Sequence, residues 1–466
     1  MPTPCWGRFS APVVVLAVCW VALGGFLASG EVFRPCRLDV VEKGSGVPVP
    51  LVELRTTHQV RFVSDNAGVI AIDAPELMGR TAWFEVVGHG YGVPQDGFGY
   101  RGVRLKPEQG GRLKIEVERT SLARRVGRWT GAGLFAESQK LGLETDWREQ
   151  GVFGCDSVQS AVHRGRLFWV WGDTTLAGYP LGIFDASAAT TPLPPARLLE
   201  APLKMRFGYF EGEGGEPRAV AKMAGTGPTW LTALVSLPTV RSEFRLGAAY
   251  MKIKPPLEAY EWGLCVWEER TQRFEALRTV WTKSETTPER GPCPDGHSAL
   301  WRDEAGVEWV LFGNPLPTLR CRATFEAWSD PAAWEVLKPQ ETIPEAKGEG
   351  RVKPHSGSIA WNPWRQRWVT VFTEKLGKPS AFGEVWYAEA ETPMGPWRGA
   401  VKILSHENYT FYNPRLHAEF TANDSSKLYF EGTFSMMFAD HAAPSARHDY
   451  NQVLYCLDFK DMPEAR

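Results

Sequence analysis

From about residue 150 to residue 460 the sequence is a succession of short apolar runs separated by turn residues. Typical runs are RLFWVWGDT, EWGLCVWEE, VEWVLFGN, RWVTVFTE and KLYFEGTFS. Runs of this length that are rich in aromatic and β-branched residues predict β-strands. Because no convincing helix alternates with them, a parallel α/β sheet is disfavoured. The sequence therefore predicts an all-β domain.

The runs group into about five units of roughly 45 to 90 residues, starting near residues 150, 205, 250, 350 and 405. This period predicts a five-bladed β-propeller with four-stranded blades, and a sandwich or jelly roll is the alternative. Closing such a ring requires one blade to combine strands from both ends of the domain. We therefore expect the last strand, from Gln452 to Phe459, to share a sheet with the segment near 150–175.

The preceding chain divides into three parts. Residues 1–30 predict a signal peptide, because Arg8 precedes an uncharged apolar run that ends in Ala28-Ser29-Gly30. The run is also long enough to remain as a membrane anchor. Residues 31–118 alternate apolar and polar positions around short turns, which predicts an N-terminal β-sandwich. Residues 119–149 are expected to form a linker to the propeller domain, residues 150–466.

The amino-acid composition limits which partners and cofactors we expect for this protein. Lys+Arg 52 against Asp+Glu 54 gives a net charge of -2, and no basic run favours a nucleic-acid partner. We expect no cofactor, since P-loop and dinucleotide-binding fingerprints are missing, and no metal site, since no local ligand spacing supports one. The 20 tryptophans fill space between sheets or offer flat platforms for sugar rings. Oligomeric state is left open.

The most informative string is GCDSVQSAVHRGRLFWVWGDTT. If Arg164-Gly165 forms a two-residue hairpin turn, Asp156 falls opposite Asp173 at the open end of the hairpin. Residues directly across an antiparallel pair have Cβ atoms about 5 Å apart on one face. The register therefore predicts two adjacent carboxyl groups, although a slip of one residue would place them on opposite faces.

Two neighbouring carboxylates raise the pKa of one of them, which gives one neutral and one ionised carboxyl near neutral pH. Glycoside hydrolysis needs that division: an acid for the leaving oxygen, and a carboxylate for the anomeric carbon or its water. Asp156 and Asp173 are thus the candidate catalytic residues. The alternative is structural, with both aspartates capping turns through their side-chain oxygens.

Other polar residues stand near predicted strand starts, where a propeller points side chains into its channel. They are candidate substrate-binding residues, and His355 or His417 could tune a carboxylate. Each of them could equally be a hydrogen-bonded structural residue or a solvated edge residue. The set is His297, His355, Glu384, Asn413, His417 and Glu431.

The paired strings G-x-D-S and W-G-D-T resemble the first blade of a family of secreted bacterial five-bladed β-propellers that includes endo-D-arabinofuranan hydrolases. YNPRLHAEF with KLYFEGTFS, and WNPWRQRWVTVF with GEVWYAEAETPMGPW, echo the same family. The resemblance implies that the first-blade acids, Asp156 and Asp173, are catalytic. The Pro-rich insertion at 191–202 and the loop at 282–296 depart from it, so substrate identity does not carry over.

The N-terminal module resembles the Ig-like sandwich related to the regulatory domain of carboxypeptidases. The shared motifs are a G-x-P-V-P entry, an S-D-x-x-G turn and a G-H-G-Y exit. This resemblance implies a spacer or accessory module, which holds the propeller away from the cell or docks on its side.

Together these observations predict an exported glycoside hydrolase acting on a polysaccharide or oligosaccharide through paired aspartates. Its location would be secreted, periplasmic or at the cell surface, with no membrane contact beyond a possible N-terminal anchor. The alternative is a non-catalytic carbohydrate-binding or surface-scaffold propeller.

Overall fold

The computed structural model describes residues 32–194, 199–421, 424–439 and 443–462 of the 466-residue chain. Residues 1–33 and 34–466 separate as two units, and every strand of the described part lies in the second. The expected signal peptide over 1–30 falls outside the described residues. Among the residues that are described, no helix is long and apolar enough to cross a membrane.

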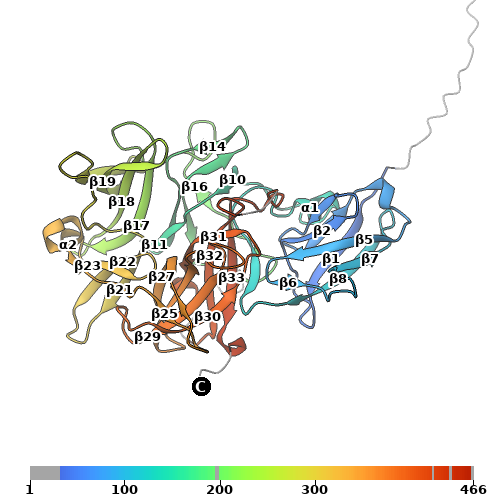
Figure 1. Ribbon diagram of the computed structural model, residues 1–466. Helices are drawn as coiled ribbons and strands as arrows, with labels where there is room; N and C mark the ends of the chain where they lie inside the picture. The colour runs from blue at the N-terminus through green and yellow to red at the C-terminus, as the bar shows by residue number, and fades with distance from the viewer. Residues whose placement is uncertain (1–31, 195–198, 422–423, 440–442, 463–466) are drawn as a thin grey trace, which may run out of the picture. The chain divides into compact units, whose positions relative to one another are not determined.

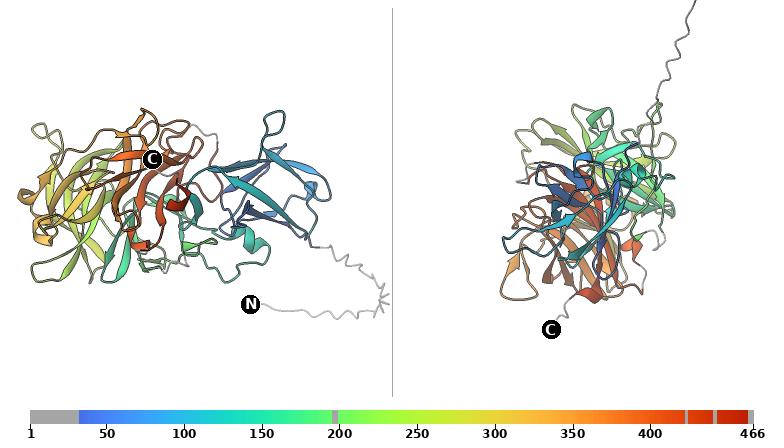
Figure 2. Two further views of the ribbon diagram at one scale, coloured as in Figure 1. Left: turned by 90° about the horizontal axis from the view of Figure 1, so that it is seen from below. Right: turned by 90° about the vertical axis from the view of Figure 1, so that its right-hand side faces the viewer.

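Five four-stranded antiparallel sheets follow one another along the chain (Figures 1 and 2). Each is a blade, and the first strands of neighbouring blades contact one another in order: β11 with β17, β17 with β21, β21 with β27, and β27 with β31. Hydrogen bonds between Arg415 on β31 and Ser160 on β11 complete the ring. The predicted five-bladed β-propeller is therefore confirmed.

The strands of the blades, from the channel outward, have the following bounds. The first blade holds β11 (Gln159–His163), β12 (Arg166–Trp171), β15 (Ser187–Pro192) and β16 (Gly208–Tyr209), and the second holds β17 (Thr229–Pro238), β18 (Phe244–Lys254), β19 (Glu258–Glu268) and β20 (Arg273–Thr282). The third holds β21 (His297–Arg302), β22 (Glu308–Gly313), β23 (Pro317–Arg322) and β24 (Glu335–Val336). The fourth holds β27 (Pro354–Asn362), β28 (Arg367–Glu374), β29 (Val385–Ala390) and β30 (Arg398–Leu404), and the fifth holds β31 (Thr410–Leu416), β32 (Lys427–Ser435), β33 (Asn451–Asp458) and β9 (Arg124–Arg128).

The fifth blade closes the ring with a strand from the N-terminal side of the domain, but not with the expected one. The last strand, β33, pairs with β9, and Val453 lies opposite Arg128. The expectation that β33 shares a sheet with residues 150–175 is wrong. The segment 119–149, expected as a linker, therefore supplies an outer propeller strand. Its string RRVGR has no apolar alternation, and its pairing depends on residues at the far end of the chain.

Smaller elements connect and flank the blades. A three-stranded sheet joins β10 (Val152–Cys155), β13 (Thr174–Leu176) and β14 (Tyr179–Ile183), and a two-stranded one joins β25 (Ile343–Pro344) to β26 (Arg351–Val352). Short helices include α1 (Ala136–Lys140), α2 (Phe325–Ser329) and the 3-10 turns Pro75–Leu77, Pro331–Ala333, Ala418–Phe420 and Phe459–Asp461.

The N-terminal module is one connected set of eight strands in the order β3-β2-β5-β6-β8-β1-β4, with β7 beside β5. It encloses its own core, which includes Leu38, Val52, Ile70 and Phe84. Its assignment to the Ig-like class stays a prediction. The bounds are β1 (Cys36–Glu42), β2 (Val52–Thr56), β3 (Arg61–Val63), β4 (Val69–Ile72), β5 (Ala82–Gly88), β6 (Tyr91–Gly92), β7 (Gly102–Leu105) and β8 (Arg112–Arg119).

Candidate functional site

The first-blade hairpin has the predicted register. Residues from His163 to Gln159 pair with residues from Arg166 to Val170. The turn residues Arg164 and Gly165 have φ of 49° and 76°. Two positive φ angles define the type I′ turn that fits the twist of a hairpin. Before Gln159 the regular pairing ends, and the Asp156 carbonyl accepts a hydrogen bond of 2.9 Å from the Gly172 N–H. Asp156 and Asp173 thus lie at the open end of this hairpin.

The half-buried Asp156 carboxyl is surrounded by hydrogen-bond donors. The Tyr412 hydroxyl donates to its Oδ2 atom at 2.9 Å. The side chains of Ser157 and Tyr450 and the backbone of Asp173 also hydrogen-bond to it. Burial raises the pKa of Asp156 to about 6, although these donors hold it down because they favour the ionised form. Asp156 is therefore a carboxylate that can take up a proton near neutral pH.

Asp173 has a different environment. Its Oδ1 atom accepts a hydrogen bond of 2.9 Å from the indole N–H of Trp230, the second residue of β17 in the next blade. Burial, and then the charge of Asp156, raise the pKa of Asp173 to about 7. The charge of Asp156 thus acts on Asp173, as expected for two carboxyl groups at the open end of one hairpin. Near neutral pH the pair can therefore hold one neutral and one ionised carboxyl.

The backbone around Asp156 is held in unfavourable conformations. Ser157, Asn413 and Tyr450 have φ of 53°, 50° and 58°, values that non-glycine residues rarely adopt. The Asn413 amide donates to the Ser157 hydroxyl at 2.8 Å, and the Ser157 N–H donates to the Thr433 hydroxyl at 3.1 Å. Such strain persists only where the surroundings over-determine it, and it clusters at functional sites. The first and fifth blades therefore build this site together.

Asn413 is thus one predicted substrate-binding residue that the structure brings beside Asp156. His417 and Glu431 lie elsewhere, in a buried polar network of the fifth blade. The His417 ring lies 2.9 Å from Glu419 and 2.7 Å from Glu431, and Trp129 donates to the other Glu431 oxygen at 2.6 Å. Burial lowers the pKa of His417, but the two glutamates outweigh it, so the net shift is upward. These contacts hold both side chains in a buried network, and their role in substrate binding stays a prediction.

The other three predicted residues are spread over the third and fourth blades. His297 is buried, and burial, followed by the charges of Arg415 and His417, lowers its pKa well below the usual value. His355 is exposed, and its ring packs 4.5 Å from that of Phe382. Glu384 is fully buried and paired with Lys402 at 2.8 Å. Its burial and pairing indicate a structural ion pair.

Sequence reasoning missed the donors to the two aspartates, Tyr412, Tyr450 and Trp230. Tyr412 is the third residue of the inner strand β31, and Trp230 is the second residue of the inner strand β17. An aromatic hydrogen-bond donor at the entry of an inner strand was the available signal. This signal becomes useful only once it is known that the inner strands of different blades begin at the same end of the channel.

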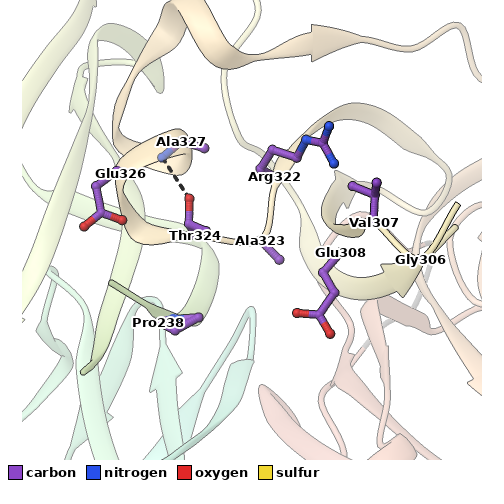
Figure 3. A pocket seen from close by; sticks show the side chains of 9 residues that line it. All are labelled: Pro238, Gly306, Val307, Glu308, Arg322, Ala323, Thr324, Glu326 and Ala327. Carbon is purple, nitrogen blue, oxygen red and sulfur yellow. Dashed lines mark hydrogen bonds between the residues drawn. The ribbon is translucent and has the colours of Figure 1, made fainter. Parts of the chain in front are cut away.

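Two further features lie apart from this site. A surface depression of about 640 Å³ is lined by residues of the second and third blades, among them Pro238, Glu308 and Arg322, and includes none of the predicted site residues (Figure 3). Within the described ranges, no group of three or more His, Cys, Asp and Glu side chains could hold a metal ion. The six described cysteines are free thiols.

Comparisons with known proteins place the chain only loosely. No family model matches it, and no curated protein does. Among solved structures it is similar to a GH43_1 enzyme from Xanthomonas citri complexed with xylose, with 11% identity over 65% of this chain and 86% of that one, and a TM-score of 0.37. It is also similar to an exo-β-1,3-galactanase from Phanerochaete chrysosporium, with 8% identity over 72% and 64% of the two chains, and a TM-score of 0.40.

A third similar structure is an exo-1,5-α-L-arabinanase from a bovine ruminal metagenomic library, with 11% identity, coverage of 66% and 94%, and a TM-score of 0.36. At such low identities and TM-scores these likenesses carry no argument about activity. Any functional assignment has to rest on the residues of the site.

Proposed function

We propose that this protein is a glycoside hydrolase that acts on a polysaccharide through Asp156 and Asp173. The observation that carries the proposal is the pair itself. Asp156 and Asp173 lie at the open end of the first-blade hairpin with pKa values of about 6 and about 7, and the charge of Asp156 helps to raise the pKa of Asp173. Side chains of the second and fifth blades hold them in place. Carboxyl pairs whose environments raise pKa values toward neutrality are typical of acid–base catalysis.

The hydrogen bonds suggest how the pair divides the reaction. Asp156 receives several donors, which stabilise its ionised form, so it acts as the nucleophile or as the base that activates water. Asp173 has the higher pKa and gives its proton to the oxygen of the leaving sugar. A separation of about 5 to 5.5 Å between the two carboxyl groups would suit a retaining mechanism, and a wider one an inverting mechanism.

The test is hydrolysis of a polysaccharide panel by the purified protein. The panel contains arabinan, galactan, xylan and D-arabinofuranan, and reducing ends are measured. Asp156→Asn and Asp173→Asn are each expected to lower turnover at least about 100-fold, because each removes one of the two groups that handle the proton and the anomeric carbon. Both variants keep the side-chain shape and one acceptor oxygen, so folding should be preserved.

Asp303→Asn is the matched control. Asp303 also accepts a hydrogen bond from an indole N–H, that of Trp309 at 2.8 Å, but it lies on the turn between β21 and β22. Its turnover should equal that of the unchanged protein. If the unchanged protein binds a panel member without cleaving it, the protein is instead the non-catalytic binding propeller, and the hydrolase proposal fails.

We also propose that residues 1–30 direct export, which would bring the enzyme to polysaccharide outside the cytoplasm. The support is the charged start, apolar run and small-residue end of that segment. N-terminal sequencing of the protein recovered from cell fractions tests this. A mature N-terminus near residue 31 in an exported fraction is expected, and an intact Met1 in the cytoplasmic fraction would contradict it.

A further inference from the structure

Aromatic side chains of two blades reach the two carboxyl groups: Trp230 comes from the second blade and Tyr412 from the fifth, and these blades neighbour the first blade on either side in the ring. On one flank Trp230 donates to Asp173, and the ring of Phe184 lies 6.4 Å from that of Trp230 at an interplanar angle of 86°. On the other flank Tyr412 donates to Asp156, and the ring of Phe438 lies 6.4 Å from that of Tyr412 at 77°. Each aspartate thus connects through one aromatic donor to one outer phenylalanine.

The outer rings face solvent. Phe184 is 43% exposed and Phe438 is 65% exposed, whereas Trp230 and Tyr412 are half-buried. Phe184 follows β14 of the flanking three-stranded sheet, and Phe438 follows β32 of the fifth blade. Exposed apolar rings forgo the stabilisation that burial would bring, so their gathering beside a polar site indicates a binding surface. The two flanks come from separate parts of the chain, and both reach the same pair.

Sugar rings suit such a surface, because their C–H faces stack on aromatic rings while their hydroxyls hydrogen-bond to nearby polar groups. Ser157 and Asn413 supply hydroxyl and amide groups directly beside Asp156. Aromatic rings on both sides of the carboxyl pair call for a ligand that continues in both directions.

We infer that the substrate chain lies across the carboxyl pair, with sugar units on Phe184 and Trp230 on one side and on Tyr412 and Phe438 on the other. This inference rests on the proposed hydrolase function and deepens it. The bond that is cleaved then has bound sugars on both sides of it. Phe184 and Phe438 bind these sugars and take no part in the chemical step.

The test compares Phe184→Ala, Phe438→Ala and the double variant on a ladder of short to long oligosaccharides prepared from the four panel polysaccharides. On the longest substrates each single variant should raise KM about three- to tenfold, which corresponds to the loss of one stacking contact. On the shortest cleaved substrate, which cannot reach both flanks, at least one single variant should act as the unchanged protein does. kcat should change little.

Phe244→Ala is the matched control. Phe244 is 51% exposed and lies opposite Pro238, at the end of the β17–β18 hairpin remote from Trp230. It should leave all kinetic constants unchanged. The inference is overturned if long substrates are cleaved equally well by both phenylalanine variants, or if only one flank contributes at every length.

Failure of the hydrolase proposal would look different, since the unchanged protein would then cleave no panel member. Affinity electrophoresis in gels containing each panel polysaccharide still measures binding in that case. If the polysaccharide retards the protein in the gel, and each phenylalanine substitution weakens this retardation, the two-sided surface is supported. If neither substitution weakens it, or the protein is not retarded at all, the two-sided surface is overturned.

Discussion

Neutral donors rather than cations hold the two aspartates of the first blade. Tyr412 and Trp230 each donate one hydrogen bond of 2.9 Å, and among the described residues no Lys, Arg or His forms an ion pair with either carboxyl. A neighbouring cation would lower the pKa of an aspartate strongly, whereas hydroxyl and indole donors lower it modestly. The pKa values can therefore stay close to neutrality, where proton transfer in both directions is efficient.

Tyr412→Phe tests this arrangement. The substitution removes the hydroxyl donor that favours the ionised form of Asp156, so the pKa of Asp156 should rise above about 6. A nucleophile or base must be ionised, so activity is lost as pH falls through this pKa. We expect the acidic limb of the kcat/KM profile to move to higher pH by up to about one unit.

The control is Tyr260→Phe, which removes a hydroxyl that donates to the Thr226 carbonyl at 2.7 Å in the second blade. Its pH profile should match that of the unchanged protein. An acidic limb that stays in place in Tyr412→Phe, with activity intact, would show that Tyr412 does not bias the ionisation of Asp156.

Sequence reasoning reached Asp156 and Asp173 because both belong to one hairpin, and the register of a hairpin follows from its turn and its period of two. It could not reach Tyr412 or Trp230, which come from other blades. Nor could it reach the network that joins His417 to Glu419 and Glu431. Which side chains at a strand start enter a buried network depends on packing between strands that are distant in sequence.

At the level of single elements, the turn of the β11–β12 hairpin fixes where the two aspartates lie. Gly165 has φ of 76°, and a Cβ added there would meet no atom within 4 Å. Gly165→Ala should therefore cost about 1 kcal/mol of stability through the backbone conformation alone. The free energy of unfolding, measured in urea, checks this value.

Gly214→Ala is the comparison, because Gly214 is also in an open turn but does not have a positive φ. It should be neutral or slightly stabilising, since the substitution restricts the unfolded chain. If the two substitutions change the free energy of unfolding equally, the left-handed backbone conformation at Gly165 is not the cause of the destabilisation.

The blades themselves could be predicted, because their strands show clear aromatic and β-branched runs between turn residues. The closing strand could not. β9 has the string RRVGR, in which Arg125 and Arg128 are both 1% exposed. Buried arginines give a strand no apolar pattern, so only the requirement that a propeller ring close pointed to a strand of this kind.

At the scale of the whole molecule, the N-terminal module and the propeller share buried contacts. The Asn66 amide donates to the carbonyls of Arg128 at 2.5 Å and Leu203 at 3.1 Å, and its oxygen accepts from the Arg128 N–H at 3.0 Å. The Arg125 guanidinium donates to the His89 carbonyl at 2.7 Å. These contacts favour a module that docks on the propeller over one that acts as a free spacer.

Asn66→Ala should therefore lower the stability of both parts together. The substitution leaves the backbone groups of Arg128 and Leu203 without their partner in a buried place, which should cost about 2 kcal/mol or more. Urea unfolding should show one transition that shifts to lower concentration. Asp96→Ala, in an exposed turn of the same module, should have a smaller effect. Two separate transitions, only the first of them shifted, would mean that the parts unfold independently.

The pairing of β9 with β33 also determines when the propeller can be completed during synthesis. Residues that lie side by side in this sheet, such as Arg128 and Val453, are roughly 325 positions apart in the chain. β9 is synthesised early, so its edge stays unpaired until β33, almost the last strand, has been made. Folding that depends on a contact between residues so far apart in the chain is slow. The chain loses conformational entropy when the long loop closes, before the contact between the two strands can stabilise it. Until then the nascent chain keeps two unpaired strand edges, which makes it a natural client for chaperones that shield such edges.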